Sequence, residues 1–302
     1  MYEILLYYKY VLIEDPEGEM RKQKELCERL GLKGRIIVAR EGINGTVEGE
    51  KVNTDKYIAE MIKDLRFENV SWKRSAGTGN AFPKLSVKAR KEIVSLHLED
   101  GAGVCDVDPN VTTGVHLKPE ELHRWIADKK EFYIVDMRNA YEHKVGYFEG
   151  SILPPIENFR DLPKVVEQIK HLKNKTVLTV CTGGVRCEKA SGFLITQGFT
   201  DVYQLENGIV SYMELYPNEN FKGKLYVFDK RVATGFYTDD AQHEIVGTCD
   251  ECGEQSENFV NCDNLVCHRH FINCKKCIEK NAGKSFCPKG CILSRHGRPV
   301  RS

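Results

Sequence analysis

Apolar residues in the first third of the chain recur with a period of two in some stretches and with a helical period in others. The Asn44–Gly45 pair lies between two extended stretches and indicates a hairpin turn. The expected strands are residues 2–11, 35–41, the stretch after Gly45, 69–75 and 85–96, and the expected helices are residues 16–31 and a segment whose apolar face is Ile58, Met61, Ile62 and Leu65. This βαββαβ order with one extra strand predicts a ferredoxin-like (acylphosphatase-like) domain over residues 1–98.

The middle of the chain begins with a segment that has no periodicity. Residues 99–116 are rich in Gly, Asp and Pro and are expected to form a linker. After it, the expected helices are residues 118–128, 160–172, 187–198 and 208–216, and the expected strands are residues 132–137, 176–180 and 201–205. Strands that alternate with helices imply a parallel sheet covered on both faces, so residues 117–228 are predicted to form a separate α/β domain.

The last segment, residues 229–302, has too few long apolar residues for a core of its own. Eight of the twelve cysteines lie in it: Cys249, Cys252, Cys262, Cys267, Cys274, Cys277, Cys287 and Cys291. In a chain without an export signal, such crowding favours metal thiolates over disulfides. The four short-spaced pairs suit two zinc sites of four cysteines each, which would be structural because four thiolates leave no open coordination position. His268 or His270 could replace a thiolate, and an iron–sulfur cluster is the alternative.

Composition excludes some classes of protein. A charged fraction of 29% with 41% hydrophobic residues is typical of a soluble globular chain. No apolar run reaches the roughly 20 residues that span a bilayer, and the first residues lack the layout of a signal peptide, so we expect a cytoplasmic protein with no membrane partner. The net charge is zero, but residues 63–91 contain eight Lys or Arg against two acids, interleaved with Phe67, Trp72 and Phe82. Such a segment suits contact with nucleic acid.

The most chemically distinctive stretch is Cys-Thr-Gly-Gly-Val-Arg at residues 181–186, directly after the apolar run 176–180. The loop is expected at the carboxyl end of the parallel sheet, where open α/β folds place their sites. Gly183 and Gly184 let backbone N–H groups turn inward, and the following helix N-terminus adds partial positive charge. Both effects favour a thiolate or persulfide at Cys181.

Other residues of this loop have supporting roles. Arg186 supplies a permanent cation that can also pair with an acid. Cys187, in the first turn of the expected helix, could resolve an oxidised Cys181 as a disulfide or could simply pack at the helix start. Thr182 and Val185 complete the loop.

This loop resembles the active loop of rhodanese domains, in which the first cysteine carries a persulfide. A second stretch resembles the Asp-x-Arg-x-x-x-Glu run and Gly-x-x-x-Gly turn of rhodanese domains, with Asp136, Arg138, Glu142, Gly146 and Gly150 at those positions. The chain departs from the usual pattern at Tyr147, Phe148 and Asn207, which concerns the substrate rather than the fold. A cysteine phosphatase would place its arginine where Cys187 stands, so the phosphatase interpretation is disfavoured.

The resemblance extends nearly from end to end to the tRNA uridine hydroxylase family, rhodanese-containing proteins that make 5-hydroxyuridine at the wobble position in an oxygen-dependent reaction. The stretches that carry it are residues 8–16, 30–49, 72–75, 82–94, 181–190, 226–233 and the terminal cysteine array. It implies tRNA and molecular oxygen as reaction partners and Cys181 as the catalytic sulfur, with Arg186 and the loop backbone stabilising its anion. No flavin, NAD or iron motif accompanies the expected two zinc ions. A thiosulfate or persulfide sulfurtransferase, including one for tRNA thiolation, and a non-catalytic zinc- and RNA-binding adaptor are the alternatives.

The expected RNA phosphate contacts are Lys73, Arg74, Lys84 and Lys88. Alternation along the strand sends Lys84 and Lys88 to one face, which favours this pair. Trp72 or Phe82 could stack on an unpaired base, although a tryptophan in such a position is more often part of a core. The alternative RNA site is the basic end of the chain, with Arg295, Arg298 and Arg301.

Overall fold

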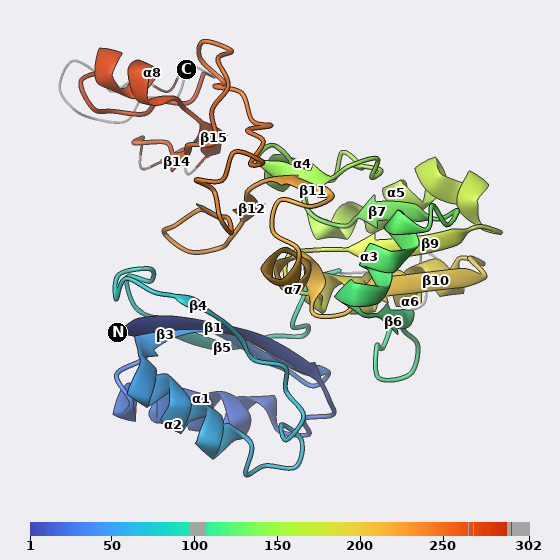
Figure 1. Ribbon diagram of the computed structural model, residues 1–302. Coiled ribbons are helices and arrows are strands. Elements are labelled where there is room, and N and C mark those ends of the chain that lie inside the picture. Colours follow the sequence, from blue (N-terminus) through green and yellow to red (C-terminus); the bar gives the residue numbers. More distant parts are fainter. Residues whose placement is uncertain (97–106, 265, 268, 289–290, 292–302) are drawn as a thin grey trace.

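The computed structural model of the protein describes residues 1–96, 107–264, 266–267, 269–288 and 291. Residues 97–106, which include the first part of the predicted linker, lie outside the described residues, as do His268 and the C-terminal arginines Arg295, Arg298 and Arg301. Figure 1 shows an N-terminal sandwich, an α/β domain beside it and a C-terminal segment above both.

The N-terminal domain is a five-stranded sheet with two helices on one face. Its strands are β1 (Tyr2–Tyr10), β2 (Lys33–Ala39), β3 (Gly42–Glu50), β4 (Lys73–Ala76) and β5 (Leu85–Ala89), and its helices are α1 (Pro16–Arg29) and α2 (Lys51–Met61). The strand order is β4-β1-β3-β2-β5, with every pair antiparallel except β2 and β5. This arrangement is ferredoxin-like with one added parallel strand, so the predicted fold is confirmed.

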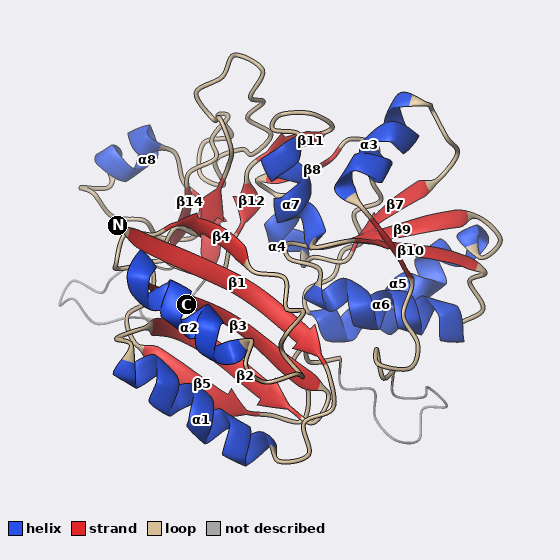
Figure 2. Ribbon diagram, turned by 60° about the horizontal axis from the view of Figure 1, so that its bottom comes forward, coloured by secondary structure: helices blue, strands red, loops and turns tan. Residues whose placement is uncertain are grey.

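Alternation along β1 gives the sheet two different faces. Leu5 and Tyr7 are buried in a core that includes Tyr57 of α2. Leu6 and Tyr8 point to the opposite face. Figures 1 and 2 show α1 and α2 together on one side of the sheet, with the other side turned toward the rest of the chain.

Two local predictions in this domain are wrong. The hairpin turns at residues 40–41, and the Asn-Gly pair lies within β3. Gly45 is needed there because a Cβ atom would come within 2.4 Å of the Tyr7 ring. Helix α2 ends at Met61, and Ile62 and Leu65 are exposed, because the buried stripe of the helix is Thr54, Tyr57 and Met61.

The α/β domain has a parallel sheet of order β6-β10-β9-β7. Its strands are β6 (Val115–Leu117), β7 (Tyr133–Asp136), β9 (Thr176–Val180) and β10 (Asp201–Leu205), and its helices are α3 (Pro119–Ala127), α4 (Ala140–His143), α5 (Leu162–Ile169), α6 (Val185–Thr196) and α7 (Gly208–Leu215), with 3-10 turns at Phe159–Asp161 and Lys170–Leu172. Helices α5 and α6 share one core with the sheet, and α3 and α7 share another. The predicted sheet covered on both faces is confirmed.

Strand β6 lies at the end of the predicted linker. It pairs with β10, and Leu117 is buried in the core. A strand of three residues is too short to show a period of two, so the sequence pattern could not distinguish it from a loop. Val107 also packs into this domain, so the described part of the linker segment belongs to the α/β domain.

The remaining elements are short antiparallel pairs and one helix. They are β8 (Gly146–Phe148) with β11 (Phe221–Gly223), β12 (Leu225–Tyr226) with β13 (Ala233–Thr234), β14 (Phe259–Asn261) with β15 (His270–Ile272), and α8 (Lys275–Lys280). In the described part of the chain, no helix combines the length and apolar character needed to cross a bilayer.

Candidate active site

The loop after β9 is a short cradle around a cysteine. β9 ends at Val180 and α6 begins at Val185, with Gly184 at the helix N-cap. Gly184 has φ +98°, a left-handed conformation, and a Cβ atom there would lie 2.8 Å from the Tyr8 hydroxyl. Its backbone N–H donates to Cys181 Sγ at 3.3 Å. Glycine therefore both permits the turn and brings a donor to the sulfur.

The two cysteines of the loop region have opposite protonation preferences. Burial raises the pKa of Cys181, but a hydrogen bond with Cys187, the charge of Arg186 and backbone N–H groups outweigh it and lower the pKa to about 6. Burial and the same hydrogen bond raise the pKa of Cys187 well above its usual range. At neutral pH the site thus holds a thiolate at Cys181 and a thiol at Cys187.

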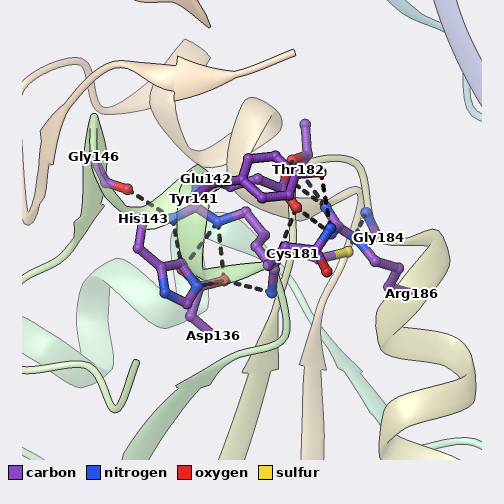
Figure 3. Close-up of polar contacts among 11 residues, drawn as sticks. Asp136, Tyr141, Glu142, His143, Gly146, Cys181, Thr182, Gly184 and Arg186 are labelled. Atoms are coloured by element: carbon purple, nitrogen blue, oxygen red, sulfur yellow. Dashed lines mark hydrogen bonds and ion pairs between the residues drawn. The ribbon is translucent and has the colours of Figure 1, made fainter. Parts of the chain in front are cut away.

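Arg186 is held by Glu142 of α4 rather than left free. Figure 3 shows its guanidinium facing that carboxylate, with Nη1–Oε1 at 2.6 Å and Nη2–Oε2 at 2.9 Å. Nη2 also donates to the Thr182 hydroxyl at 3.3 Å, and the backbone N–H of Asn139 donates to Glu142 at 2.9 Å. Since both oxygens of Glu142 are engaged, the pair fixes the start of α6 against α4.

Asp136 and Arg138 form a second buried ion pair. The Arg138 Nη2–Asp136 Oδ2 distance is 2.6 Å, and Nη2 also donates to the Gly146 carbonyl at 2.8 Å. Burial raises the pKa of Asp136, but Arg138 and His143 outweigh it and hold the pKa well below its usual range. None of these side chains lines the cavity at Cys181, so they support the loop from behind.

Cys181 opens into a cavity of about 330 Å³ between the two domains. One wall is the loop itself, with Thr182, Gly183 and Val185. The opposite wall is the helix-free face of the N-terminal sheet and its surroundings: Leu6, Tyr8, Arg35, Ile37, Asn44, Thr46 and Phe82. Asn139, Arg186, Phe159 and Phe228 also contribute. A mostly apolar cavity with a few polar groups and a reactive sulfur suits a flat organic substrate.

Direct contacts hold the N-terminal sheet against α6. The Tyr8 hydroxyl donates to Glu188 at 3.0 Å, and the Tyr10 hydroxyl donates to the Val185 carbonyl at 3.2 Å. Lys189 is fully buried and pairs with Glu41 at 2.9 Å and with Glu92 at 2.6 Å. Sequence analysis missed these residues as site components, although the alternation along β1 already placed Tyr8 and Tyr10 on one face.

Three family models match successive parts of the chain. Residues 2–93 match the UPF0176 acylphosphatase like domain, residues 118–215 match the Rhodanese-like domain, and residues 222–292 match the Rhodanase C-terminal model. A tRNA uridine(34) hydroxylase from Cytophaga hutchinsonii is 43% identical over 298 residues, which are 99% of this chain and 92% of that protein. One from Bacillus licheniformis is 44% identical over 293 residues, 96% of this chain and 87% of that protein. The chain belongs to the tRNA uridine(34) hydroxylase family.

The tRNA uridine(34) hydroxylase family and the rhodanese character of the central domain agree with the resemblance stated from sequence. Among solved structures, a Rhodanese-like domain protein from Staphylococcus aureus aligns at 26% identity with a TM-score of 0.29, covering 32% of this chain and 90% of that one. That TM-score is too low to add to the assignment.

The basic residues expected to contact RNA occupy different environments in this tRNA uridine(34) hydroxylase family member. Lys84 and Lys88 are exposed at the edge of the N-terminal sheet, and among the described residues neither has an ion pair. Arg74 instead pairs with Glu3 at 2.8 Å and Asp55 at 2.7 Å. Lys73, the preceding residue on β4, has a buried Nζ. The environments differ because alternate residues of β4 point to opposite sides of the sheet.

The two aromatic candidates for base stacking also lie apart. Trp72 packs on the Tyr7 ring, with centroids 4.6 Å apart, and belongs to the core beneath the helices. Phe82 is buried and lines the Cys181 cavity. Only Phe82 is therefore near the candidate active site.

The eight C-terminal cysteines form two groups that could each hold a metal ion. Their sulfur atoms lie within 4.8 Å of one another in the sets Cys249, Cys252, Cys274 and Cys277, and Cys262, Cys267, Cys287 and Cys291. The two groups alternate along the sequence: the first and third cysteine pairs form one group, and the second and fourth pairs form the other. Backbone N–H groups donate to Cys249, Cys274 and Cys262, as expected for thiolates. His270 belongs to neither set, and its Nδ1 atom meets the Tyr226 hydroxyl.

Proposed function

We propose that this protein hydroxylates uridine 34 of tRNA to 5-hydroxyuridine, with Cys181 as the reacting sulfur. The observation that carries the proposal is the buried Cys181 thiolate opening into a cavity whose far wall belongs to another domain. The names of the relatives at 43% and 44% identity supply the substrate. A tRNA substrate would place the enzyme in the cytoplasm.

The chemistry follows from the reactivity of uracil. Addition of a thiolate to C6 makes C5 nucleophilic, so C5 can accept one oxygen atom from molecular oxygen. The second oxygen atom leaves as water, and its two electrons and two protons come from two molecules of a small external thiol, which become a disulfide. Loss of the C5 proton and elimination of Cys181 from C6 then give 5-hydroxyuridine and the free thiolate.

The residues around Cys181 position it for this reaction. The backbone N–H groups of Gly184, Arg186 and Cys187 stabilise the sulfur anion. Gly183 lets the loop pass close to Leu6, and Thr182 and Val185 shape the loop. Arg186 contributes positive potential while its ion pair with Glu142 fixes the loop. We assign Cys187 as the thiol that forms a hydrogen bond with the Cys181 thiolate, and the pair of Asp136 and Arg138 as the support behind the loop.

RNA would approach along the β5 edge of the N-terminal sheet. In the register of β5 with β2, Lys88 lies opposite Ile37, a residue that lines the Cys181 cavity. Lys88 and, by alternation, Lys84 therefore flank the cavity on the same face as the exposed Arg35. We propose Lys84 and Lys88 as phosphate contacts.

We further propose that both cysteine groups hold zinc. Four thiolates arranged within reach of one another match a tetrahedral structural site, and no open position remains for a substrate. The ions would supply the folding free energy that a segment with so small a core lacks.

Purified full-length protein incubated with tRNA that lacks the modification tests the proposal. We expect 5-hydroxyuridine in the digested nucleosides, dependent on Cys181 and on oxygen. Sulfur replacing oxygen adds nearly the same mass as inserting oxygen, so chromatography with accurate mass is required. Thiouridine would instead support the sulfurtransferase, and tRNA binding without any modification would support the adaptor.

A further inference from the structure

Lys73 carries a buried ammonium group that has neither a hydrogen bond nor an ion pair with a carboxylate in the described part of the chain. Its Nζ atom is inaccessible to solvent and makes no hydrogen bond to any described residue. The nearest ring is Tyr8, whose centroid lies 4.9 Å from Nζ. Burying an ammonium group without a hydrogen bond or a counter-ion is costly, so its retention at this position requires an explanation.

The negative groups that act on Lys73 lie at or near the Cys181 site. Burial lowers the pKa of Lys73 to about 8, and the strongest opposing influence is Cys181, followed by Glu188 and Glu206. Glu188 already accepts hydrogen bonds from Tyr8 and other neighbours, namely Thr113, Gln204 and His116. The Cys181 sulfur is therefore the negative group that acts most strongly on Lys73.

Arg186 also lowers the pKa of Cys181, but it is committed to a carboxylate. Its guanidinium makes a bidentate pair with Glu142, so most of its charge is balanced within the loop support. Among the described residues, Lys73 is a buried cation near Cys181 with no carboxylate bound to it, whereas Arg35, which lines the Cys181 cavity and also has no ion pair, is exposed to solvent.

The position of Lys73 also fits a role in the reaction. It lines a cavity of about 440 Å³ next to the Cys181 cavity. The two cavities share the lining residues Leu6, Thr46, Thr182 and Phe228. Lys73 and Cys181 thus line neighbouring cavities, and Lys73 lies opposite Leu6 in the register of β4 with β1, on the helix-free face of the sheet that the Cys181 loop covers.

We propose that Lys73 is a catalytic cation of this site, stabilising first the Cys181 thiolate and then the oxygen anion that forms on the uracil ring when this thiolate adds to C6. The inference rests on the proposed function. In the addition, a sulfur lone pair forms the S–C6 bond and the C5=C6 π electrons move to give an enolate with its charge on O4. The negative charge passes from sulfur to oxygen, and no proton, oxidant or reductant is needed. An ammonium fixed beforehand in a dry site stabilises both anions without rearrangement.

The first test uses no tRNA. Peptide-resolved alkylation of Cys181 by iodoacetamide across a range of pH measures how readily the thiolate forms. In Lys73→Met the midpoint should rise by about one pH unit, so that roughly tenfold less thiolate is present at pH below the midpoint. Lys73→Arg should keep the low midpoint. Lys56→Met, which removes an exposed lysine on α2 far from the cavity, is the matched control.

The second test follows the addition step alone. With oxygen excluded and deuterated water as solvent, reversible addition at C6 exchanges the C5 hydrogen of the target uridine. Lys73→Met should slow this exchange by about 10²-fold, while tRNA affinity stays unchanged.

An unchanged alkylation midpoint in folded Lys73→Met, or a midpoint that rises equally in Lys73→Arg, would overturn the inference. If wild-type protein neither exchanges C5 hydrogen nor hydroxylates tRNA, the proposed function fails instead, and the alkylation result still decides whether Lys73 is the partner of the thiolate.

Discussion

The guanidinium of Arg186 and the carboxylate of Glu142 bind each other through two parallel hydrogen bonds, of 2.6 and 2.9 Å, inside the protein. Arg186 stands at the start of α6, next to the reactive loop, whereas Glu142 lies on α4. The loop is therefore anchored to a second element by its own arginine. Because the pair is saturated, recognition of a substrate anion has to come from other residues.

Cys181→Ser should abolish hydroxylation while the protein stays folded. Serine keeps the shape of the side chain, but its alkoxide is inaccessible near neutral pH, so we expect the rate to fall at least about a thousandfold. Nucleoside analysis of treated tRNA measures the loss, and circular dichroism checks the fold. Cys187→Ser should lose less; an equal loss would favour a disulfide cycle between the two, and full activity in Cys181→Ser would refute the assignment of the sulfur.

The rate of Cys181 alkylation in the wild-type protein should be half-maximal near pH 6. The thiolate is the reactive form, and the pKa of this thiol is lowered from its ordinary 9.0 to about 6. Alkylation should therefore rise with pH through this range and be nearly constant above it. Cys27, whose pKa burial raises to about 12, is an internal control that should stay unreactive. A half-maximal rate for Cys181 near its ordinary pKa of 9.0 would contradict the thiolate.

Arg138→Met should destabilise the protein by roughly 3–5 kcal/mol, because it leaves the Asp136 carboxylate buried without its main partner. Urea unfolding measures the change in the free energy of unfolding. Arg124→Met, at an exposed position of α3, should stay within about 0.5 kcal/mol of wild type. Equal stabilities of the two variants would show that the buried pair does not support the loop.

Metal analysis should find about two zinc ions per chain. Cys249→Ser and Cys262→Ser each remove a ligand from a different group, so each should reduce the content to one ion or fewer. Because the bound ions would supply folding free energy to the segment after Thr248, a chelator should unfold this segment before the α/β domain. Limited proteolysis can follow the two events. Cys27→Ala, in the N-terminal core, should retain both ions. Two ions in either serine variant would refute the assigned ligand sets.

Replacing Lys84 and Lys88 with Ala should weaken tRNA binding and reduce its salt dependence by roughly one unit of log–log slope for each lost contact. Binding measured at several salt concentrations tests this. Lys22 and Lys56, exposed on the helices of the opposite face, provide the matched double variant with the same loss of charge. If both double variants lose affinity equally, the effect is one of net charge, and the β5 edge is not the RNA site.

The sequence predicted both large domains because their patterns are local. A strand such as β9, buried throughout, and a helix such as α1, with Pro16 at its start, are visible in one stretch of chain. The hairpin turn is predicted in the wrong place because an Asn-Gly pair occurs both in tight turns and inside strands where a side chain packs on the glycine. Only the Tyr7 ring packed against Gly45 shows that the second case applies.

The Cys181 loop could be predicted because all its parts are consecutive. The cavity could not, since Tyr8 and Cys181 are far apart in sequence and no local pattern says which surface covers the loop. Alternation in β4 does distinguish Lys73 from Arg74, but not the direction in which each points. The pairing of the cysteines was likewise undetermined, because equal spacings allow adjacent pairs or alternate pairs to share an ion.

The contacts of Tyr8 and Tyr10 with α6 hold two domains together around one cavity. The α/β domain provides the sulfur of Cys181, and the N-terminal domain provides the wall that a substrate base would contact. Selectivity can therefore change in evolution while the sulfur loop stays intact: substitutions on the strand face that leave Lys73 in place would redirect the enzyme to another base. A rhodanese unit cut away from its neighbour would lose the wall that a base contacts together with the ammonium group of Lys73, so it would lose its choice of substrate and form its thiolate less readily.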